Sequence, residues 1–323
     1  MKILFISSGN NKVGISPIVF NQGESLKQQG IDIDYFTIKG KGLWGYIKNI
    51  PKIRYALNKE NYDIIHAHYG LCSIVSQIAK KKEKLVVSFM GDDLIGSVGS
   101  NGKYTILGNI LVFLNRLFIP KYDYVIVKSK FLAKNLNNKN YAIIPNGVNM
   151  NAFFEINKEK ARKAINANPN KKILIFVANP NRPEKNFFLA KESVDLLKFE
   201  NIELRSVYSV DQEKLKYYYS AADVLLQTSF HEGSPNVIKE AMACNCPIVS
   251  TDVGDVKWII GHTEGCYIAD SNPNDFSEKI KLALDFASKK GRTKGRDRII
   301  ELGLDSDTIA KKIIDIYKYV LKK

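Results

Sequence analysis

Residues 2–36 have the sequence KILFISSGNNKVGISPIVFNQGESLKQQGIDIDYF. Its two ends, KILFI and DIDYF, are short runs rich in apolar and β-branched residues, which is typical of strands. Between them, residues 18–29 place apolar side chains at helical spacing. A strand, a helix and a second strand in this order predict a parallel βαβ unit.

The same alternation continues along the chain as far as residue 144. The further predicted strands are residues 63–68, 85–89, 123–128 and 141–144, with a helix at residues 106–118. PNGVNMNAFF, residues 145–154, then interrupts both periods with Pro, Gly and Asn. The rhythm restarts with strands predicted at residues 172–178, 202–208, 222–227, 247–250 and 266–269.

This pattern predicts two doubly wound parallel α/β domains in tandem. We place them at residues 1–146 and 147–305. Helices alone are predicted beyond residue 272, and the last of them, at 306–321, carries one apolar stripe and begins at the capping residue Ser306. Ligands of such sheets bind at the carboxyl ends of the strands, so we expect a deep cleft between the domains.

Composition and charge narrow the possible classes of protein. The chain has 323 residues, of which 45% are apolar and 25% charged, which suits two globular domains and excludes a disordered chain. The net charge of +15 favours an anionic partner, although a general excess of lysine explains it equally well. There is no zinc-finger, RNA-recognition or basic-zipper signature, so a nucleic-acid partner is not expected.

The cysteines and the apolar runs indicate the compartment. MKILFISSGN has no charged leader followed by an apolar stretch, so a cytoplasmic protein is expected. Cys244 and Cys246 form a CxC without the second pair that a zinc site needs, so we expect buried thiols. The longest apolar run, residues 110–114, is far too short to cross a bilayer.

The stretch richest in chemistry is HEGSPNVIKEAMACNCPIVSTDVGD, residues 231–255. Ser234 and Pro235 predict a helix start, with the serine side chain as the cap. The free amides of Asn236 and Val237 would then attract a phosphate. Glu232 before the helix and Glu240 inside it can reach different parts of one ligand, or they are solvated surface acids.

A second basic segment, NPNRPEKN at residues 179–186, follows the strand predicted at 172–178. Arg182 and Lys185 stand there at a strand's carboxyl end, where two cations can neutralise a diphosphate without a metal.

EGSPNVIKEA followed by PIVSTDVG resembles the donor-site signature of the group 1, family 4-like, retaining glycosyltransferases of GT-B fold. NPNRPEKN, YYYSAADVLLQTS, PNGVN, SFMGDDL and KVGISP agree with the family in order, over nearly the whole chain. The resemblance implies two Rossmann-like domains, the N-terminal one receiving the acceptor and the C-terminal one binding the nucleotide sugar. It also implies that the helix at 306–323 crosses back to the first domain.

The resemblance assigns roles position by position. Glu232 would lie by the hydroxyls of the donor sugar, and Glu240 would hold the ribose. Arg182 and Lys185 would bind the diphosphate together with the backbone amides of Asn236 and Val237. Gly14 would approach the phosphate and sugar from the first domain.

Acceptor-side candidates come from two strand ends. His66 and His68 share one face of a strand, and a structural role is favoured over catalysis. His68 is kept as a candidate beside Asp93, which the family pattern favours over Asp92.

Three positions depart from the family pattern and bear on donor identity rather than on the fold. Pro180 stands where the phosphate-binding Arg is usual, Met90 where a His is common, and Asp255 where the second Gly of a Gly-Gly pair is usual.

The expected reaction is transfer of a sugar from a nucleotide-diphosphate donor to a hydroxyl acceptor with retention, in the synthesis of cell-surface polysaccharide or glycolipid. No cofactor and no metal are expected. The alternatives are a GT-B sugar-nucleotide epimerase or hydrolase, and, in another class, a catalytically lapsed binding protein or a basic nucleic-acid binder.

A lipid-linked glycan acceptor would require contact with the inner face of the membrane. GLWGYIKNIPKIRYAL, residues 42–57, mixes cations with Trp44, Tyr46 and Ile47, and four lysines cluster at residues 80–84. These segments predict either an anionic membrane surface for docking or a solvated basic face.

Overall fold

A computed structural model describes the chain except for residues 11–13, 100–102, 137–139 and 199. Contacts within the chain divide it into two compact units. The first unit consists of Met1–Ser97, Tyr104–Gly147 and Ser306–Lys323, and the second of Val98–Lys103 and Val148–Asp305. Each unit is described by itself.

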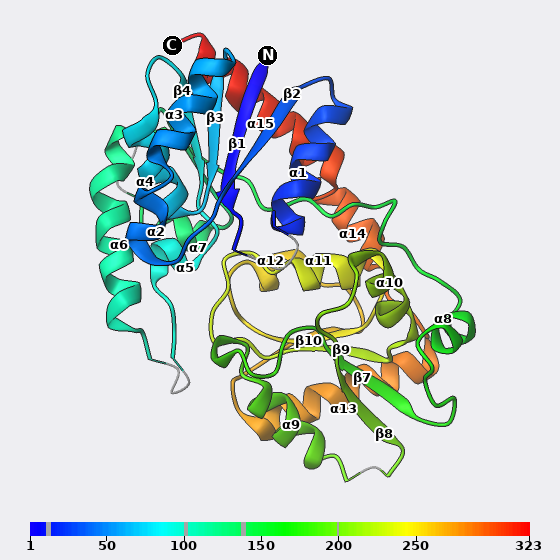
Figure 1. The fold of residues 1–323 in the computed structure, drawn as a ribbon. Helices are drawn as coiled ribbons and strands as arrows, with labels where there is room; N and C mark the ends of the chain where they lie inside the picture. Colours follow the sequence, from blue (N-terminus) through cyan, green and yellow to red (C-terminus); the bar gives the residue numbers. More distant parts are fainter. Residues whose placement is uncertain (11–13, 100–102, 137–139, 199) are drawn as a thin grey trace. The chain divides into compact units, whose positions relative to one another are not determined.

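The first unit is built on a parallel sheet in the order β2-β1-β3-β4-β5-β6 (Figure 1). Its strands are β1 (Lys2–Ser8), β2 (Asp32–Ile38), β3 (Ile64–His68), β4 (Lys84–Ser88), β5 (Tyr124–Val127) and β6 (Tyr141–Ile143). All six strands predicted before residue 145 are confirmed, with ends that differ by at most two residues.

Helices cover both faces of this sheet. They are α1 (Pro17–Gln28), α2 (Gly42–Ile47), α3 (Ile50–Lys59), α4 (Gly70–Ala79), α5 (Asp92–Ile95), α6 (Ile106–Phe118), the 3-10 turn η1 (Ile119–Lys121), α7 (Lys130–Ala133) and α15 (Ser306–Leu321). A hydrophobic core lies between one face of the sheet and the helices α3 and α4. It contains residues such as Ile6, Ile65, Ile53 and Val75.

The C-terminal helix α15 lies on the other face of the sheet, where it contacts α1 and β4. The stripe of Ile309, Ile313, Ile316 and Val320 is buried, as the periodicity predicts. Ser306 is the first residue of the helix rather than its cap. The helix α15 is therefore part of the first unit.

The second unit has a parallel sheet in the order β11-β10-β9-β7-β8. Its strands are β7 (Lys172–Phe176), β8 (Ile202–Ser206), β9 (Val224–Gln227), β10 (Ile248–Thr251) and β11 (Cys266–Ala269). Its helices are α8 (Lys158–Ala164), η2 (Pro183–Lys185, 3-10), α9 (Phe187–Asp195), α10 (Gln212–Ala221), α11 (Asn236–Ala243), α12 (Val256–Ile260), α13 (Pro273–Lys289) and α14 (Gly295–Glu301). All five predicted strands are confirmed.

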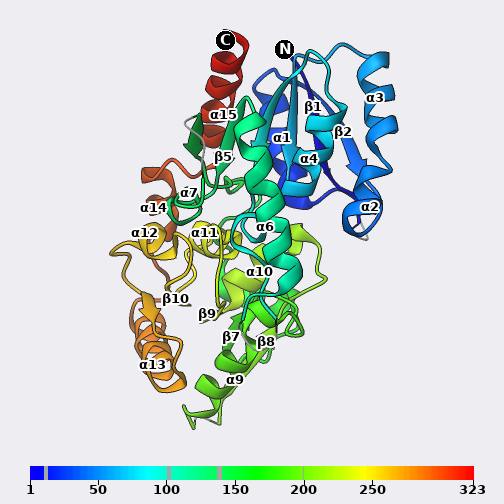
Figure 2. The ribbon, with the colours of Figure 1, turned by 90° about the vertical axis from the view of Figure 1, so that its left-hand side faces the viewer.

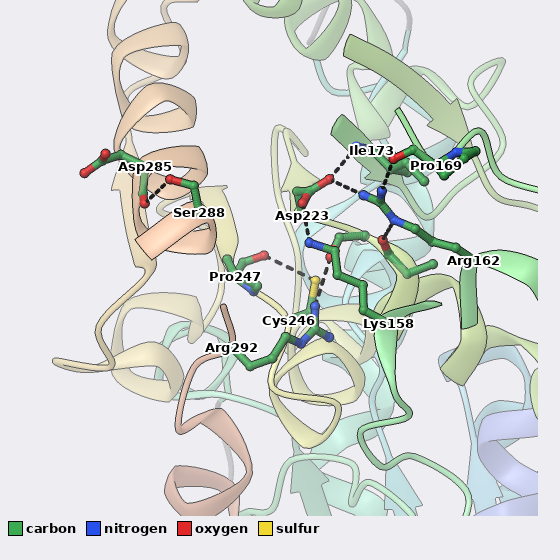
Figure 3. Close-up of polar contacts among 12 residues, drawn as sticks. Lys158, Arg162, Pro169, Ile173, Asp223, Cys246, Pro247, Asp285, Ser288 and Arg292 are labelled. Carbon is green, nitrogen blue, oxygen red and sulfur yellow. Dashed lines mark hydrogen bonds and ion pairs between the residues drawn. The ribbon is translucent and has the colours of Figure 1, made fainter. Parts of the chain in front are cut away.

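Asp223, just before β9, fastens the start of this unit to its sheet (Figure 3). Its carboxylate accepts hydrogen bonds from Lys158 Nζ at 2.5 Å, Arg162 at 2.9 Å and the Ile173 amide at 2.6 Å. Two cations of α8 and one strand amide thereby share a largely buried acid, which is the arrangement that makes a buried charge tolerable.

The cysteines form no disulfide, and Cys72, Cys244 and Cys246 are buried while Cys266 is half-buried. Buried thiols are thus confirmed.

Candidate active site in the second unit

Three loops meet at the carboxyl ends of β10, β9 and β7, which are neighbours in the sheet. The Thr228 hydroxyl, after β9, donates to the carbonyls of Lys185 and Asn186 at 3.0 and 2.9 Å. The Thr251 hydroxyl, at the end of β10, donates to the Ser229 carbonyl at 2.8 Å. These bonds hold the three loops together, as expected where parallel strands end at one edge.

Lys185 and Glu232 meet at this edge. Lys185 Nζ bonds Glu232 Oε1, and each side chain is about one-sixth exposed, at 17% and 15%. The same carboxylate oxygen accepts hydrogen bonds from Gln227 Nε2 at 3.0 Å and Ser229 Oγ at 2.8 Å. Lys185 and Glu232 are 47 positions apart in the sequence and were predicted as site residues from two separate motifs. The structure brings them together.

Gly254, in the loop after β10, packs closely against the backbone of Glu232 and Gly233. Its φ is +61°, and a Cβ there would lie 2.8 Å from the Gly233 carbonyl oxygen and 2.9 Å from that of Glu232. Only glycine satisfies both conditions. The residue after it, Asp255, is consequently held beside the Glu232 loop.

Lys239 is a buried cation that was not predicted from the sequence, and the charge of Asp255 acts on it. Lys239 is 0% exposed, and its ammonium group donates to Ser234 Oγ at 3.0 Å. Burial lowers the pKa of Lys239 to about 8, against the opposing effect of Asp255 and two glutamates. Burial also raises the pKa of Asp255 to about 6, although Lys239 favours its ionised form.

Both oxygens of Asp255 are buried and have no hydrogen-bond partner in the described part of the chain. A sequence signal for the position of Lys239 does exist. It precedes Met242 and Ala243, both buried, by three and four residues, which places it on the inward side of its helix.

The helix α11 begins one residue later than predicted. Its N-cap is Pro235, with no side-chain cap hydrogen bond, and its first two residues are Asn236 and Val237. The prediction that Ser234 caps this helix is wrong, because its hydroxyl oxygen accepts the hydrogen bond of Lys239. The first amides of α11 remain outside its internal hydrogen-bond ladder, as the anion-site prediction requires.

Glu240 is half-buried on α11 and bonded within the unit. The Tyr219 hydroxyl donates to its Oε2 at 2.7 Å. Burial raises the pKa of Glu240, while Tyr219 and Lys239 act in the opposite direction. The alternative of a freely solvated surface acid is wrong.

Arg182 is not brought together with Lys185 and Glu232. Its guanidinium bonds Glu184, with Nε at 2.6 Å, and its side chain is 56% exposed. In the predicted contact with a diphosphate, Arg182 would move away from Glu184, whose side chain is only 16% exposed.

The candidates in the first unit are described apart from these. Gly14 has a φ of +79°, and a Cβ there would meet nothing within 4 Å. Asp93 is 0% exposed and accepts hydrogen bonds from the amides of Gly70, Met90 and Gly91. Burial raises the pKa of Asp93 to about 6. This carboxylate fastens the loop after β4.

His66 and His68 are both buried in β3. His66 bonds the Tyr317 hydroxyl at 2.5 Å and Ser88 Oγ at 2.8 Å, so the favoured structural role fits its contacts. Neither ring nitrogen of His68 has a hydrogen-bond partner among the residues described, and the ring stacks on His66 at 4.2 Å between centroids.

Comparisons with known proteins agree with this architecture. The fold matches sucrose-phosphate synthase of Thermosynechococcus elongatus with a TM-score of 0.85 at 18% identity, covering 99% of both chains. It matches Anabaena HepE, solved in complex with UDP, with a TM-score of 0.72 at 16% identity, covering 99% of this chain and 100% of that one. The class is thus the GT-B glycosyltransferase fold of two parallel-sheet α/β domains.

The family model described as Glycosyl transferases group 1 matches residues 160–285, and that of Glycosyltransferase Family 4 matches residues 18–152. Between them the two models cover most of both units. The chain belongs to the group 1, family 4-like, glycosyltransferases.

Two relatives illustrate the range of the family. N-acetyl-alpha-D-glucosaminyl L-malate synthase of Bacillus anthracis is 24% identical over 68% of this chain, and the matched part spans only 64% of that protein. A Campylobacter jejuni protein, N,N'-diacetylbacillosaminyl-diphospho-undecaprenol alpha-1,3-N-acetylgalactosaminyltransferase, is 24% identical over 93% of this chain and 89% of its own length.

Proposed function

We propose that this protein transfers a sugar from a nucleotide-diphosphate sugar to a hydroxyl acceptor with retention at the anomeric carbon. The observation that carries the proposal is the pair of Lys185 and Glu232, which lies where β7 and β9 end. Glu232 stands four residues before the first residue of α11. A cation, a carboxylate and a helix N-terminus there suit a diphosphate joined to a polyhydroxylated sugar.

Each group has a distinct task in this reaction. The ammonium of Lys185 and the amides of Asn236 and Val237 stabilise negative charge as the phosphate leaves. The carboxylate of Glu232 accepts hydrogen bonds from sugar hydroxyls, and that of Glu240 from the ribose. Positioning the donor accounts for much of the expected rate increase.

Three further assignments complete the proposal. Arg182 joins the diphosphate site after leaving Glu184, and Gly14 contacts the phosphate and sugar. His68 and Asp93 serve the acceptor side, Asp93 by fixing the loop after β4. No metal takes part, because the cations and amides neutralise the diphosphate.

The names of the compared proteins support the classes of substrate. HepE was solved in complex with UDP-glucose, and the Campylobacter relative is named for an undecaprenol-linked acceptor. We infer a nucleotide-sugar donor and a glycan or lipid-linked acceptor, in the synthesis of cell-surface polysaccharide or glycolipid, at the cytoplasmic side of the membrane.

The test is a panel of UDP-, GDP- and ADP-sugars incubated with the protein and followed by proton NMR. Slow hydrolysis of one donor should release the sugar first as the anomer present in that donor, and excess EDTA should leave the rate unchanged. Release of the opposite anomer would contradict retention, and loss of the reaction in EDTA would contradict a metal-free site. No reaction with any donor, together with no binding of UDP, GDP or ADP by calorimetry, would refute the proposal.

A further inference from the structure

Helix α6 exposes a long apolar stripe. Ile106 is 80% exposed, Ile110 51%, Phe113 61% and Leu117 53%, at spacings of four, three and four residues that keep them on one side of the helix. Leu107, 79% exposed, lies beside the first of them. Scattered apolar side chains on a surface are ordinary, whereas a contiguous stripe of this kind marks an interaction surface.

The opposite side of the helix is already occupied. Gly108, Val112 and Asn115 are buried, and α6 contacts α4 and α5. Figure 2 turns this side of the first unit toward the viewer, with α6 in front of α4. The exposed stripe therefore belongs to a helix that is firmly seated in the unit.

The apolar surface continues beyond α6 into a groove of about 500 Å³. Phe113 and Val112 form one wall, with Tyr104, Phe131 and Leu94 around them. Tyr104 is 51% and Phe131 42% exposed. We call the exposed stripe and this groove the α6 surface.

Charge identifies what the α6 surface fits. From Leu94 to Phe154 the sequence contains one acid, Asp123, which is bonded to Lys80, and the exposed Asp92 of α5 comes just before this stretch. The same stretch contains seven cations: Lys103, Arg116, Lys121, Lys128, Lys130, Lys134 and Lys139. Arg116 is exposed on α6, Lys121 is exposed in η1 just after it, and Lys130 and Lys134 are exposed at the two ends of α7, the helix that carries Phe131 of the groove. Apolar side chains bordered mainly by cations complement an anionic lipid surface.

We propose that the α6 surface docks on an anionic lipid bilayer, with α6 lying in the plane of the interface. A helix of 13 residues is about 20 Å long, which suits lying on a bilayer rather than crossing it. In the described part of the chain no helix has the length and apolarity to span a membrane. Cations beside the stripe each contribute by attraction to the headgroups.

This location differs from the one predicted from the sequence. In α2 and α3, Trp44 and Tyr55 are exposed, at 75% and 70%, but Tyr46 is buried at 5% and cannot meet a membrane. Because α2 and α6 both contact α4, they cover the same face of the sheet. Variants of the two segments can therefore be compared directly.

The first test is co-sedimentation of the full chain with vesicles of phosphatidylcholine alone or mixed equally with phosphatidylglycerol. The wild type should sediment with the mixed vesicles and dissociate from them at high salt. With the neutral vesicles, the protein should stay largely in the supernatant. I106E/L107E should lower the binding at least tenfold. Two glutamates in the first turn of a helix suit its dipole, so the fold should persist, as circular dichroism would show.

Matched controls separate the α6 surface from general effects of charge. L282E/I300E adds the same two negative charges as I106E/L107E, at apolar residues of the second unit that are 48% and 58% exposed. This variant should bind the vesicles as the wild type does. W44A tests α2 and should reduce binding much less than I106E/L107E. Equal loss in L282E/I300E and I106E/L107E would overturn the proposal, as would full loss in W44A alone.

A spectroscopic test reports contact directly. The chain has two tryptophans, Trp44 and Trp258, so a W44F/W258F/I110W protein carries one reporter on α6. Its emission should shift to the blue and be quenched by brominated lipid in mixed vesicles only. Unchanged emission would overturn the proposal, as would a dimer that I106E/L107E converts to monomer without any vesicle binding.

The inference goes beyond the proposed reaction. Vesicle binding is measured without turnover, so its failure leaves the transfer proposal standing, and the failure of the donor panel leaves the docking proposal standing.

Discussion

Lys185 is the residue on which the proposed chemistry depends most directly, because its ammonium is the cation bonded to Glu232. Lys185→Ala and Glu232→Ala should each lower kcat by about a hundredfold or more, the effect usual for losing one stabilising group in a polar active site. Neither side chain belongs to a hydrophobic core, so the unfolding temperature should change little.

Lys191→Ala is the matched control, since Lys191 is an exposed lysine of the neighbouring α9. Its kcat should equal that of the wild type. Steady-state kinetics with the donor found in the panel, together with a thermal melt of each variant, would decide. Full activity of Lys185→Ala would contradict its role.

Sequence alone could identify Glu232 and Lys185, because each stands in a motif just after a predicted strand. It could not show that they touch, because contact depends on which strands are neighbours. Lys239 was missed for a different reason. A lysine in a short amphipathic helix is usually solvated, and the spacing of Lys239 from Met242 and Ala243 is a weak signal beside the complete burial that the structure shows.

At the scale of elements, alternation of strand and helix predicted all eleven strands that the structure contains in its described residues. Strand ends and helix caps were less predictable. Ser234 has the residue type of an N-cap, but a buried ammonium competes for its hydroxyl oxygen, and α11 begins after Pro235 instead. Local propensity decides a cap only where no stronger partner is near.

Strand β3 carries a pH dependence that can be measured. Burial lowers the pKa of His66 and of His68 well below the ordinary value, with Lys128 acting in the same direction. Both rings are neutral in the folded chain, whereas in the unfolded chain they bind protons below about pH 6.5. The contribution of these two histidines to the free energy of unfolding should therefore fall as the pH falls below that value, by up to about 1.4 kcal/mol per pH unit for each histidine. Asp93, whose pKa burial raises to about 6, contributes in the opposite direction.

His68→Phe should flatten this acid branch, because the phenyl ring can stack on Phe5 and His66 without titrating and no hydrogen bond is lost. His262→Asn, at an exposed position, should leave the branch unchanged. Urea unfolding between pH 7 and pH 5 gives the comparison. If wild type and His68→Phe lose stability in parallel, His68 is not a source of the dependence.

At the scale of the whole molecule, the path of the chain does not divide into one continuous segment for each unit. It completes the first sheet before residue 148, builds the second unit, and then returns with α15 to the first. The apolar stripe in residues 306–321 predicted a helix that needs a surface, and the family resemblance indicated which one. Periodicity alone could not choose between two sheets of similar construction.

This return makes the two units differ in their dependence on the C-terminus. A chain ending at Asp305 would lose the four aliphatic side chains of the buried stripe, Ile309, Ile313, Ile316 and Val320, among other buried residues of α15, and the Tyr317 hydroxyl that bonds His66. Burial of four such side chains is worth roughly 6 to 12 kcal/mol, comparable to the whole stability of a domain. The first unit should therefore unfold in the shortened chain, while the second, whose residues end at Asp305, should stay folded.

Differential scanning calorimetry and limited proteolysis would show the difference. The chain ending at Asp305 should keep a protease-resistant core that starts near Val148, with the segment before it digested. A chain ending at Leu321 lacks only two exposed lysines and should behave as the full chain does. A first unit that remains resistant without α15 would mean that β1 to β6 and the helices α1 to α7 bury enough surface by themselves, and that the returning helix has a role other than stability.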